Sequence, residues 1–239
     1  MKSVLMTITI LFYSVSWASS PLPSTARGLE SMDNVHEVRL PKVLRGSTPV
    51  GEQLKLLVDQ GVTDILVFKK EKDGEVSSEL MAFEGLGLKT SSLNHISAEW
   101  KIALPFRQTC EQYVRALLLI REVEKSEDRR IYFHCTAGQD RTSLLAGLYQ
   151  VLHGENAREV FEKEMCGRGY EAGGGQEKPM TVIRAIRRNL TPFYLQMVQL
   201  IQTQGITLDQ LTPEICLSAE PSILSPSQVA QWQCRQSQN

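Results

Sequence analysis

The sequence has almost no net charge, because its 26 Lys and Arg residues are balanced by 27 Asp and Glu residues, which leaves a formal charge of −1. Proteins that bind nucleic acid or a membrane surface usually carry a basic excess, so neither nucleic acid nor stable membrane association is expected. Cysteine is also sparse. The five cysteines form no Cys-x-x-Cys pair or His/Cys cluster, so neither a metal site nor another cofactor is expected. The sequence gives no indication of an oligomeric state.

An apolar run lies close to the N-terminus, over residues 4–15, after the basic Lys2. This run is short for a membrane-spanning helix, and small residues at Ser16 and Ala18 are typical of a signal-peptide cleavage site. We therefore expect a signal peptide over residues 1–18 and a periplasmic or secreted mature chain of residues 19–239. That length suits one domain. An uncleaved N-terminal anchor is the alternative.

Apolar periodicity in the rest of the chain alternates between strand-like and helix-like segments. Strands are expected within residues 43–49, 62–68, 93–96 and 131–134. Helices are expected over residues 50–61, 75–86, 108–126, 142–153, 155–166 and 180–204, the last one broken near Pro192. Residues 19–36 read as an irregular arm and residues 167–179 as a Gly-rich loop. This alternation predicts an α/β fold: a single domain with a central, mostly parallel sheet flanked by helices.

The most informative pattern lies between residues 131 and 143. An apolar strand-like stretch leads into Cys135, then a short loop with Gly138, then Arg141 and an apolar helix-like stretch. Such a loop can turn its backbone N–H groups inward as an anion-binding nest, and the helix adds free N–H donors and the positive end of its dipole. This field should hold the Cys135 thiol as a thiolate near neutral pH, while the Arg141 guanidinium binds two phosphate oxygens.

Residues 134–142 read HCTAGQDRT and resemble the signature H-C-x-x-G-x-x-R-[ST] of the cysteine-dependent protein tyrosine phosphatase superfamily. The stretches RGSTP, from Arg45, and GVTDIL, from Gly61, also resemble the N-terminal half of atypical dual-specificity phosphatases. The resemblance therefore covers most of the region between residues 38 and 190, with its strongest motif at the loop. We interpret Arg45 as a structural residue that pairs with a carboxylate beneath the sheet.

The resemblance implies a role for each residue of the loop. Cys135 would attack phosphorus to form a cysteinyl-phosphate, and Arg141 would stabilise charge on the phosphate oxygens. The Thr142 hydroxyl would stabilise the sulfur as the leaving group of the second step, and His134 would hold the loop through hydrogen bonds. The residues expected to surround the bound phosphate are Thr136, Ala137, Gly138 and Gln139.

The general acid is less clear from the sequence. Phosphatases of the resembled type supply an upstream Asp, but Ile102 stands at the matching place in this chain. Asp140, directly before the loop arginine, is the preferred candidate, because myotubularin-like lipid phosphatases and some exported bacterial phosphatases carry an Asp there. Glu99 is the second candidate, and a role for Asp140 in orienting the loop is the alternative to acid catalysis.

The expected substrate is a small polyanionic phosphate ester. Exported tyrosine-phosphatase-like phytases have a similar loop, which favours an inositol polyphosphate such as inositol hexakisphosphate. The alternatives are a phosphotyrosine, dual-specificity or phosphoinositide phosphatase acting on another cell, and a phosphate-binding module without turnover. Gln139 replaces the Lys of the phosphoinositide-associated pattern. The basic residues considered as further substrate contacts are Lys69, Lys70, Lys101, Arg107, Arg168 and Lys178.

Export would place the four remaining cysteines in an oxidising compartment, where thiols tend to pair. Four cysteines allow three pairings. Cys216 and Cys234 bracket a Pro- and Ser-rich tail with little periodicity, so we expect a disulfide between them that stabilises the tail. Four free thiols are the alternative.

Overall fold

The computed structural model describes residues 28–39, 41–173, 175, 177–218 and 223–234. The predicted signal peptide and its cleavage site lie outside these residues. Within these residues, a five-stranded sheet has the order β1-β2-β5-β3-β4, with β1 antiparallel to β2 and the other neighbours parallel. The strands are β1 (His36–Arg39), β2 (Val43–Gly46), β3 (Asp64–Val67), β4 (Leu93–His95) and β5 (Ile131–His134). The predicted α/β fold with a mostly parallel sheet is confirmed.

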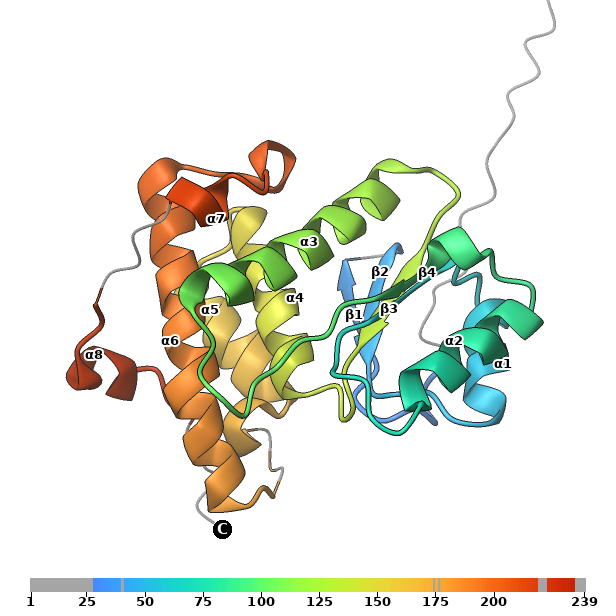
Figure 1. The fold of residues 1–239 in the computed structure, drawn as a ribbon, viewed down its shortest axis with the longest axis horizontal. Helices are drawn as coiled ribbons and strands as arrows, with labels where there is room; N and C mark the ends of the chain where they lie inside the picture. Colours follow the sequence, from blue (N-terminus) through green and yellow to red (C-terminus); the bar gives the residue numbers. More distant parts are fainter. Residues whose placement is uncertain (1–27, 40, 174, 176, 219–222, 235–239) are drawn as a thin grey trace, which may run out of the picture.

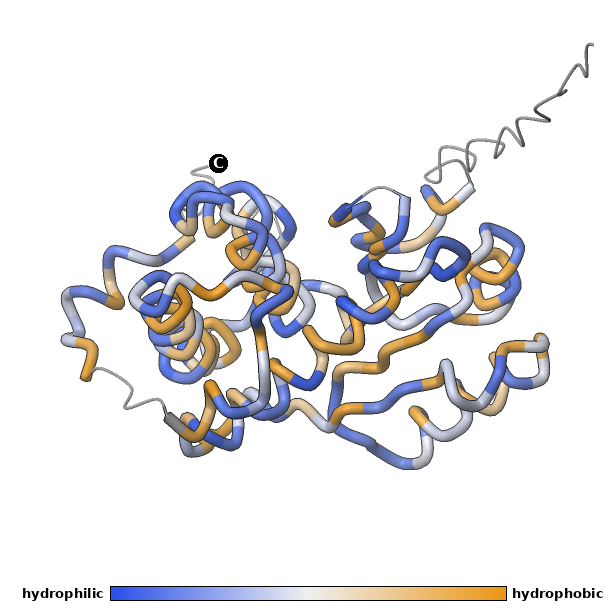
Figure 2. Tube along the Cα trace, turned by 90° about the horizontal axis from the view of Figure 1, so that it is seen from above, coloured by the Kyte–Doolittle hydropathy of each residue, from blue (hydrophilic) through white to orange (hydrophobic). Residues whose placement is uncertain are grey.

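Helices cover both faces of the sheet (Figure 1). The helices on one face are α1 (Glu52–Asp59) and α2 (Glu75–Gly85), and those on the other face are α3 (Phe106–Lys125), α4 (Asp140–Leu152) and α6 (Met180–Gln204). Side chains alternate between the two layers: Ile65 and Val67 pack toward α1 and α2, whereas Leu66 packs toward α3 and α4. The three inner strands β2, β3 and β5 are buried throughout, and apolar segments run through the interior between the two helical layers (Figure 2).

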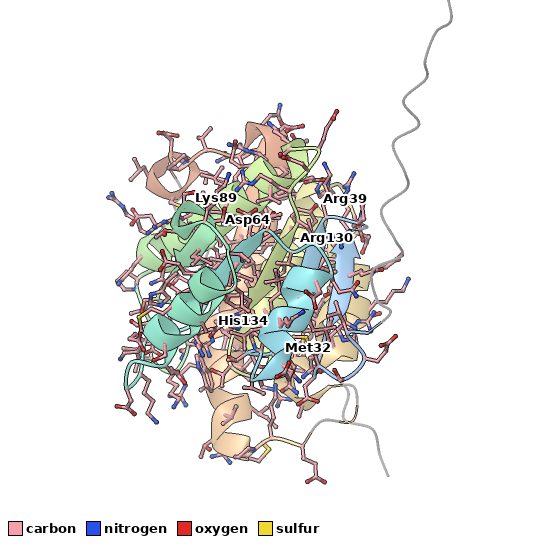
Figure 3. The ribbon with its side chains drawn as sticks, turned by 90° about the vertical axis from the view of Figure 1, so that its right-hand side faces the viewer. Met32, Arg39, Asp64, Lys89, Arg130 and His134 are labelled. Carbon is pink, nitrogen blue, oxygen red and sulfur yellow. A yellow bond between two sulfur atoms is a disulfide. The ribbon has the colours of Figure 1, made fainter. Side chains whose placement is uncertain are left out.

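The register of the sheet places the end of β5 beside the ends of its two neighbours. His134 lies opposite Gly46 of β2 and Val67 of β3. In Figure 3, His134 lies near one end of the sheet, and Asp64 and Arg130 lie near the other. The loops that follow β2, β3 and β5 therefore meet at the carboxyl edge, where parallel α/β sheets bind their ligands.

The segment after α4 departs from a simple helix. The expected helix over residues 155–166 begins as α5 (Ala157–Val160), continues as the π-turn η2 (Phe161–Met165) and ends as the 3-10 turn η3 (Cys166–Arg168). Asn156 caps its start, because its side chain accepts hydrogen bonds from two backbone N–H groups of the first turn. The Gly-rich loop contains another short turn, η4 (Tyr170–Ala172).

The expected break near Pro192 does not occur, because α6 continues through it from Met180 to Gln204. Proline removes one backbone hydrogen bond from a helix. The helix is buried on both sides of this residue, with Leu190, Thr191 and Tyr194 each at most 1% exposed. Packing of this face against the core therefore outweighs the lost hydrogen bond.

The predicted Cys216–Cys234 disulfide is wrong. Cys216 is bonded to Cys110 of α3, and Cys234 is bonded to Cys166 after η2. Instead of closing the tail on itself, each bond joins the tail to the helical layer. The tail also has more local structure than its sequence suggested, because it contains the 3-10 turn η5 (Leu208–Gln210) and the short helices α7 (Ile215–Ser218) and α8 (Pro226–Ala230). Another 3-10 turn, η1 (Thr90–Ser92), lies directly before β4.

Candidate active site

The loop between β5 and α4 is built around a glycine in the left-handed region. Gly138 has φ 67°, and a Cβ at this position would contact the backbone of Gly46 and lie 2.6 Å from the backbone nitrogen of Ser47. Any side chain would therefore collide with the backbone that follows β2. Glycine is required here both by conformation and by space.

A buried ion pair supports the same loop from below. Arg45 is fully buried, and its Nη1 lies 2.5 Å from Oε1 of Glu164. Its Nη2 donates to the carbonyl oxygen of Gly138 at 2.5 Å and to Oγ of Ser143 at 2.8 Å. Arg45 thus joins η2, the loop and the start of α4. The predicted structural role of Arg45, paired with a carboxylate, is confirmed.

The nucleophile candidate lies at the base of this loop. Cys135 is 3% exposed, and it is the free cysteine among the described residues. Burial alone would raise the pKa of its thiol, but the charge of Arg141 and hydrogen bonds from the hydroxyl and backbone N–H of Thr142 outweigh burial and lower it. The backbone N–H of Cys135 in turn donates to Oγ1 of Thr142 at 2.9 Å. Thr142 therefore contacts the cysteine as the sequence predicted.

Arg141 connects the loop to the segment that follows β4. Its Nη1 donates to the carbonyl oxygen of Ala98 at 3.1 Å, and its Nη2 lies 3.4 Å from Oγ1 of Thr136. Arg141 is a buried residue, 8% exposed, so its guanidinium is held beside the thiol rather than in solvent. A guanidinium has five N–H donors, so donors remain for a phosphate after these contacts.

His134 lies behind the nucleophile, fully buried at the end of β5. Its Nδ1 lies 3.1 Å from the carbonyl oxygen of Cys135, which can only accept, and its Nε2 lies 2.7 Å from Oε1 of Glu79 in α2. Lys69 belongs to the same buried group, because its Nζ donates to Oγ1 of Thr48 at 3.1 Å and lies 3.8 Å from Oε2 of Glu79. The expected substrate contact of Lys69 is therefore corrected: this side chain, 2% exposed, supports the loop from behind.

A cleft of about 490 Å³ opens above the thiol. Two of the predicted substrate contacts, Lys70 and Lys101, line it. Arg107 and Arg168 do not, since Arg107 is paired with Glu111 in α3 and Arg168 is an exposed residue outside the cleft lining. Gln139 faces a neighbouring cavity of about 650 Å³ that shares two loop residues with the cleft. The residues lining the cleft are Lys70, Glu71, Lys72, Glu75, Glu99, Trp100, Lys101, Cys135, Thr136, Ala137, Asp140 and Arg141.

Both candidate acids line this cleft, but their surroundings differ. Glu99 accepts hydrogen bonds from the backbone N–H groups of Trp100 and Lys101, each at 2.8 Å. Burial raises its pKa, but these two hydrogen bonds and the charge of Lys70 outweigh burial, so the pKa of Glu99 is lowered. A general acid must hold a proton before the reaction, so this lowering disfavours Glu99.

Asp140 is the first residue of α4, next to Arg141 in the chain. Its Oδ1 lies 2.6 Å from Nζ of Lys178 and accepts from the backbone N–H of Glu171 at 3.3 Å. Lys178 is therefore not a cleft residue but a partner of the acid candidate. Ile102, which stands where the resembled phosphatases carry their acid, is 62% exposed and does not line the cleft.

Two functional carboxylates were missed in the sequence. Glu79 lies on the buried face of α2 together with Val76 and Phe83, and Glu164 follows Val160 by one helical turn. A carboxylate at an apolar-face position must have a buried partner. This signal could have indicated a polar network, although it could not have named the partners, which come from other strands.

No family model and no curated protein sequence matches this chain. Solved structures do match. The catalytic core of the PP-IP phosphatase Siw14 from S. cerevisiae is 20% identical, with 64% of this chain and 84% of that one covered and a TM-score of 0.46. TpbA from P. aeruginosa is 18% identical over 69% and 91%, with a TM-score of 0.46, and Tk-PTP is 19% identical over 65% and 95%, with a TM-score of 0.45. Because these sequence identities and TM-scores are low, the similarity carries no argument about function, which rests on the site.

Proposed function

We propose that this protein is an exported phosphomonoesterase that works through a cysteinyl-phosphate and removes phosphate from inositol polyphosphates. The observation that carries the proposal is the base of the cleft. There, a buried thiol with a lowered pKa lies beside Arg141 and Thr142, and Asp140 lines the same cleft. A nucleophile, a phosphate-binding cation and a proton donor are the groups that phosphate ester hydrolysis through a covalent intermediate requires.

The first step transfers the phosphoryl group to sulfur. The Cys135 thiolate attacks phosphorus in line with the leaving oxygen, the S–P bond forms and the P–O bond breaks. Asp140 gives its proton to the leaving alkoxide. Arg141 and the loop backbone stabilise the charge on the three equatorial oxygens of the transition state.

The second step releases phosphate. A water molecule gives a proton to the Asp140 carboxylate as its oxygen attacks phosphorus, and the S–P bond breaks. The hydrogen bonds from Thr142 stabilise the thiolate that leaves. This returns Cys135 and Asp140 to their starting forms.

The charged rim of the cleft supports a polyanionic substrate. Lys70, Lys72 and Lys101 are exposed at the cleft. Glu71 on the same rim is engaged locally, since its carboxylate accepts the backbone N–H groups of the first turn of α2. Glu99 is held in the same way by its own segment, and its Oε2 lies 3.8 Å from Nζ of Lys70. The exposed lysines of the rim would supply the positive charge that meets further phosphates of a substrate.

Phosphate release from three substrates tests the proposal: inositol hexakisphosphate, a phosphotyrosine peptide and a phosphoinositide in mixed micelles. We expect the highest kcat/KM with the inositol polyphosphate, and no turnover of any substrate by Cys135→Ser, which should still bind. Preference for the peptide or the lipid would contradict the substrate assignment alone. Turnover by Cys135→Ser equal to that of the unsubstituted protein would contradict the covalent mechanism.

A further inference from the structure

The segment between η3 and α6 holds two buried residues in an unfavourable backbone conformation. Glu171 and Ala172 have φ 52° and 68°, in the left-handed region that residues with a side chain rarely occupy. Both are buried, and Glu171 is fully so. Such a conformation persists only where the surroundings impose it, and it is concentrated at functional sites.

The Glu171 carboxylate is fixed by three donors from two distant parts of the chain. Oε1 accepts from Oγ1 of Thr191 at 2.9 Å, and Oε2 accepts from Nε of Arg187 at 3.0 Å, both from α6. Oε2 also accepts from the backbone N–H of Cys234 at 3.2 Å. The side chain of Glu171 therefore joins its segment to α6 and to the C-terminal tail.

The backbone of the same segment fixes Asp140. The N–H of Glu171 donates to Oδ1 of Asp140 at 3.3 Å, and Nζ of Lys178 bridges that Oδ1 and the carbonyl oxygen of Gly169, each at 2.6 Å. Both donors contact Oδ1, so the segment between η3 and α6 sets the direction in which the Asp140 carboxyl group lies.

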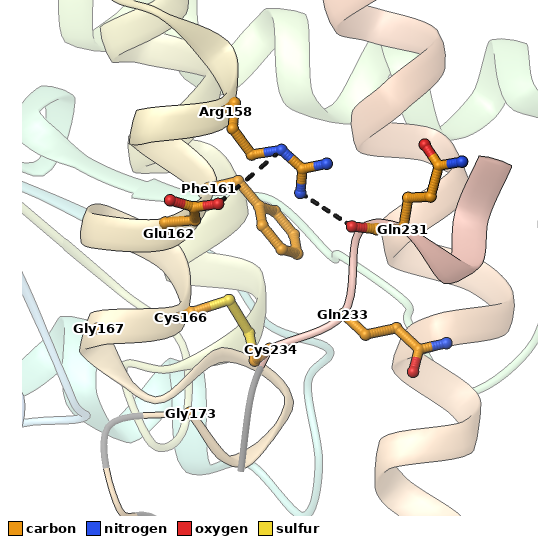
Figure 4. Close-up of a pocket in the computed structure, with 9 residues that line it drawn as sticks. All are labelled: Arg158, Phe161, Glu162, Cys166, Gly167, Gly173, Gln231, Gln233 and Cys234. Atoms are coloured by element: carbon orange, nitrogen blue, oxygen red, sulfur yellow. Dashed lines mark hydrogen bonds and ion pairs between the residues drawn. A yellow bond between two sulfur atoms is a disulfide. The ribbon is translucent and has the colours of Figure 1, made fainter. Parts of the chain in front are cut away.

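The tail that contacts Glu171 is held by the Cys166–Cys234 disulfide, which forms part of the wall of a surface cavity of about 590 Å³ (Figure 4). Arg158 holds the same tail through the carbonyl oxygen of Gln231 at 2.9 Å and through the ring of Trp232, 4.0 Å from its guanidinium carbon. Cys166 and Cys234 both line this cavity. The other disulfide joins α3 to α7, whereas the tail residue that donates to Glu171 is Cys234.

We propose that Glu171 is a positioning residue for Asp140 and that the Cys166–Cys234 disulfide secures it, so that the redox state of this bond controls proton transfer in the active site. This inference rests on the proposed function, in which Asp140 is the general acid. A dithiol reductant would break the S–S bond by supplying two electrons and two protons. Two cysteine thiols form, and the reductant becomes a disulfide. The tail then withdraws the Cys234 N–H from the Glu171 carboxylate, and the acid loses part of its orientation while the thiolate and Arg141 stay in place.

The test compares two double variants, Cys166→Ser/Cys234→Ser and the matched control Cys110→Ser/Cys216→Ser. For each, kcat and KM are measured on an inositol phosphate, whose alkoxide leaving group needs a proton, and on para-nitrophenyl phosphate, whose leaving group hardly does. We expect the first variant to lose between about 10-fold and 100-fold in kcat on the inositol phosphate, with a flatter alkaline limb of the pH profile, and much less on the aryl phosphate. The control should keep the ratio of the two activities unchanged.

Equal losses on both substrates, or the same change of ratio in the control, would overturn the proposal. If the Cys166→Ser/Cys234→Ser variant does not fold, Glu171→Gln decides, because glutamine keeps the length of the side chain but loses the ion pair with Arg187. If Glu171→Gln leaves the ratio of activity on the inositol phosphate to activity on para-nitrophenyl phosphate unchanged, the positioning proposal is overturned. Asp140→Asn in the same assay separates the two levels of inference. Equal losses on both substrates for Asp140→Asn contradict the acid assignment. If Asp140→Asn shows a loss that depends on the leaving group and the disulfide variant does not, only the positioning proposal is contradicted.

Discussion

Replacement of Asp140 by Asn separates proton donation from every other contribution of this residue. Asparagine has the same shape, and its Oδ1 can still accept from Nζ of Lys178 and from the N–H of Glu171, which lie 2.6 Å and 3.3 Å from it in the structure. The side chain should therefore stay in place. What is lost is the transferable proton and the negative charge.

The size of the effect follows from these two losses. General acid catalysis contributes about 10²- to 10⁴-fold, which corresponds to about 3–5 kcal/mol of transition-state stabilisation. This loss is expected in full for an inositol alkoxide and hardly at all for para-nitrophenolate. The negative charge of Asp140 raises the pKa of the Cys135 thiol. Its removal lowers that pKa further, so the nucleophile remains available at acidic pH.

The assay is steady-state kinetics on an inositol phosphate and on para-nitrophenyl phosphate, over a range of pH, for Asp140→Asn and for Glu99→Gln. We expect a large, leaving-group-dependent loss for Asp140→Asn and a small, uniform one for Glu99→Gln. The reasoning is refuted if Asp140→Asn loses equally on both substrates while Glu99→Gln shows the leaving-group dependence. The acid would then be Glu99, despite its lowered pKa.

Three further predictions concern the nucleophile, the support of the loop and export. The lowered pKa of Cys135 means that its thiolate persists below the pH range of an ordinary cysteine, so inactivation by iodoacetamide should decline only at more acidic pH. Arg141→Met should move that midpoint upward, and an unchanged midpoint would show that Arg141 does not stabilise the thiolate. Arg45→Met should destabilise the fold by about 3–5 kcal/mol in urea denaturation, because it leaves the Glu164 carboxylate buried without its partner. A loss below about 1 kcal/mol, typical of an exposed pair, would contradict this account. Mass spectrometry of the protein secreted from an expressing cell should find Ser19 at the N-terminus, and an intact Met1 would rule out cleavage by a signal peptidase.

The parts of the candidate site that are contiguous in the chain could be predicted from the sequence. The strand, the loop and the helix that carry Cys135, Gly138 and Arg141 follow one another within a few residues, so local pattern was enough to predict them. The same holds for the buried strands and for most helices, whose apolar periodicity depends on near neighbours.

Features that depend on contacts between distant residues could not be predicted in this way. The two disulfides span 106 and 68 residues, and which cysteines meet depends on how the tail packs against α3 and η2. Lys69 looked like a substrate contact because charge is usually exposed, yet a buried glutamate from α2 and a threonine after β2 hold it behind the loop. The place of Asp140 beside Arg141 follows from the motif, and its role as the acid stays a prediction. Its partners Glu171 and Lys178 could not be predicted, because they reach it only when the chain folds back after α4.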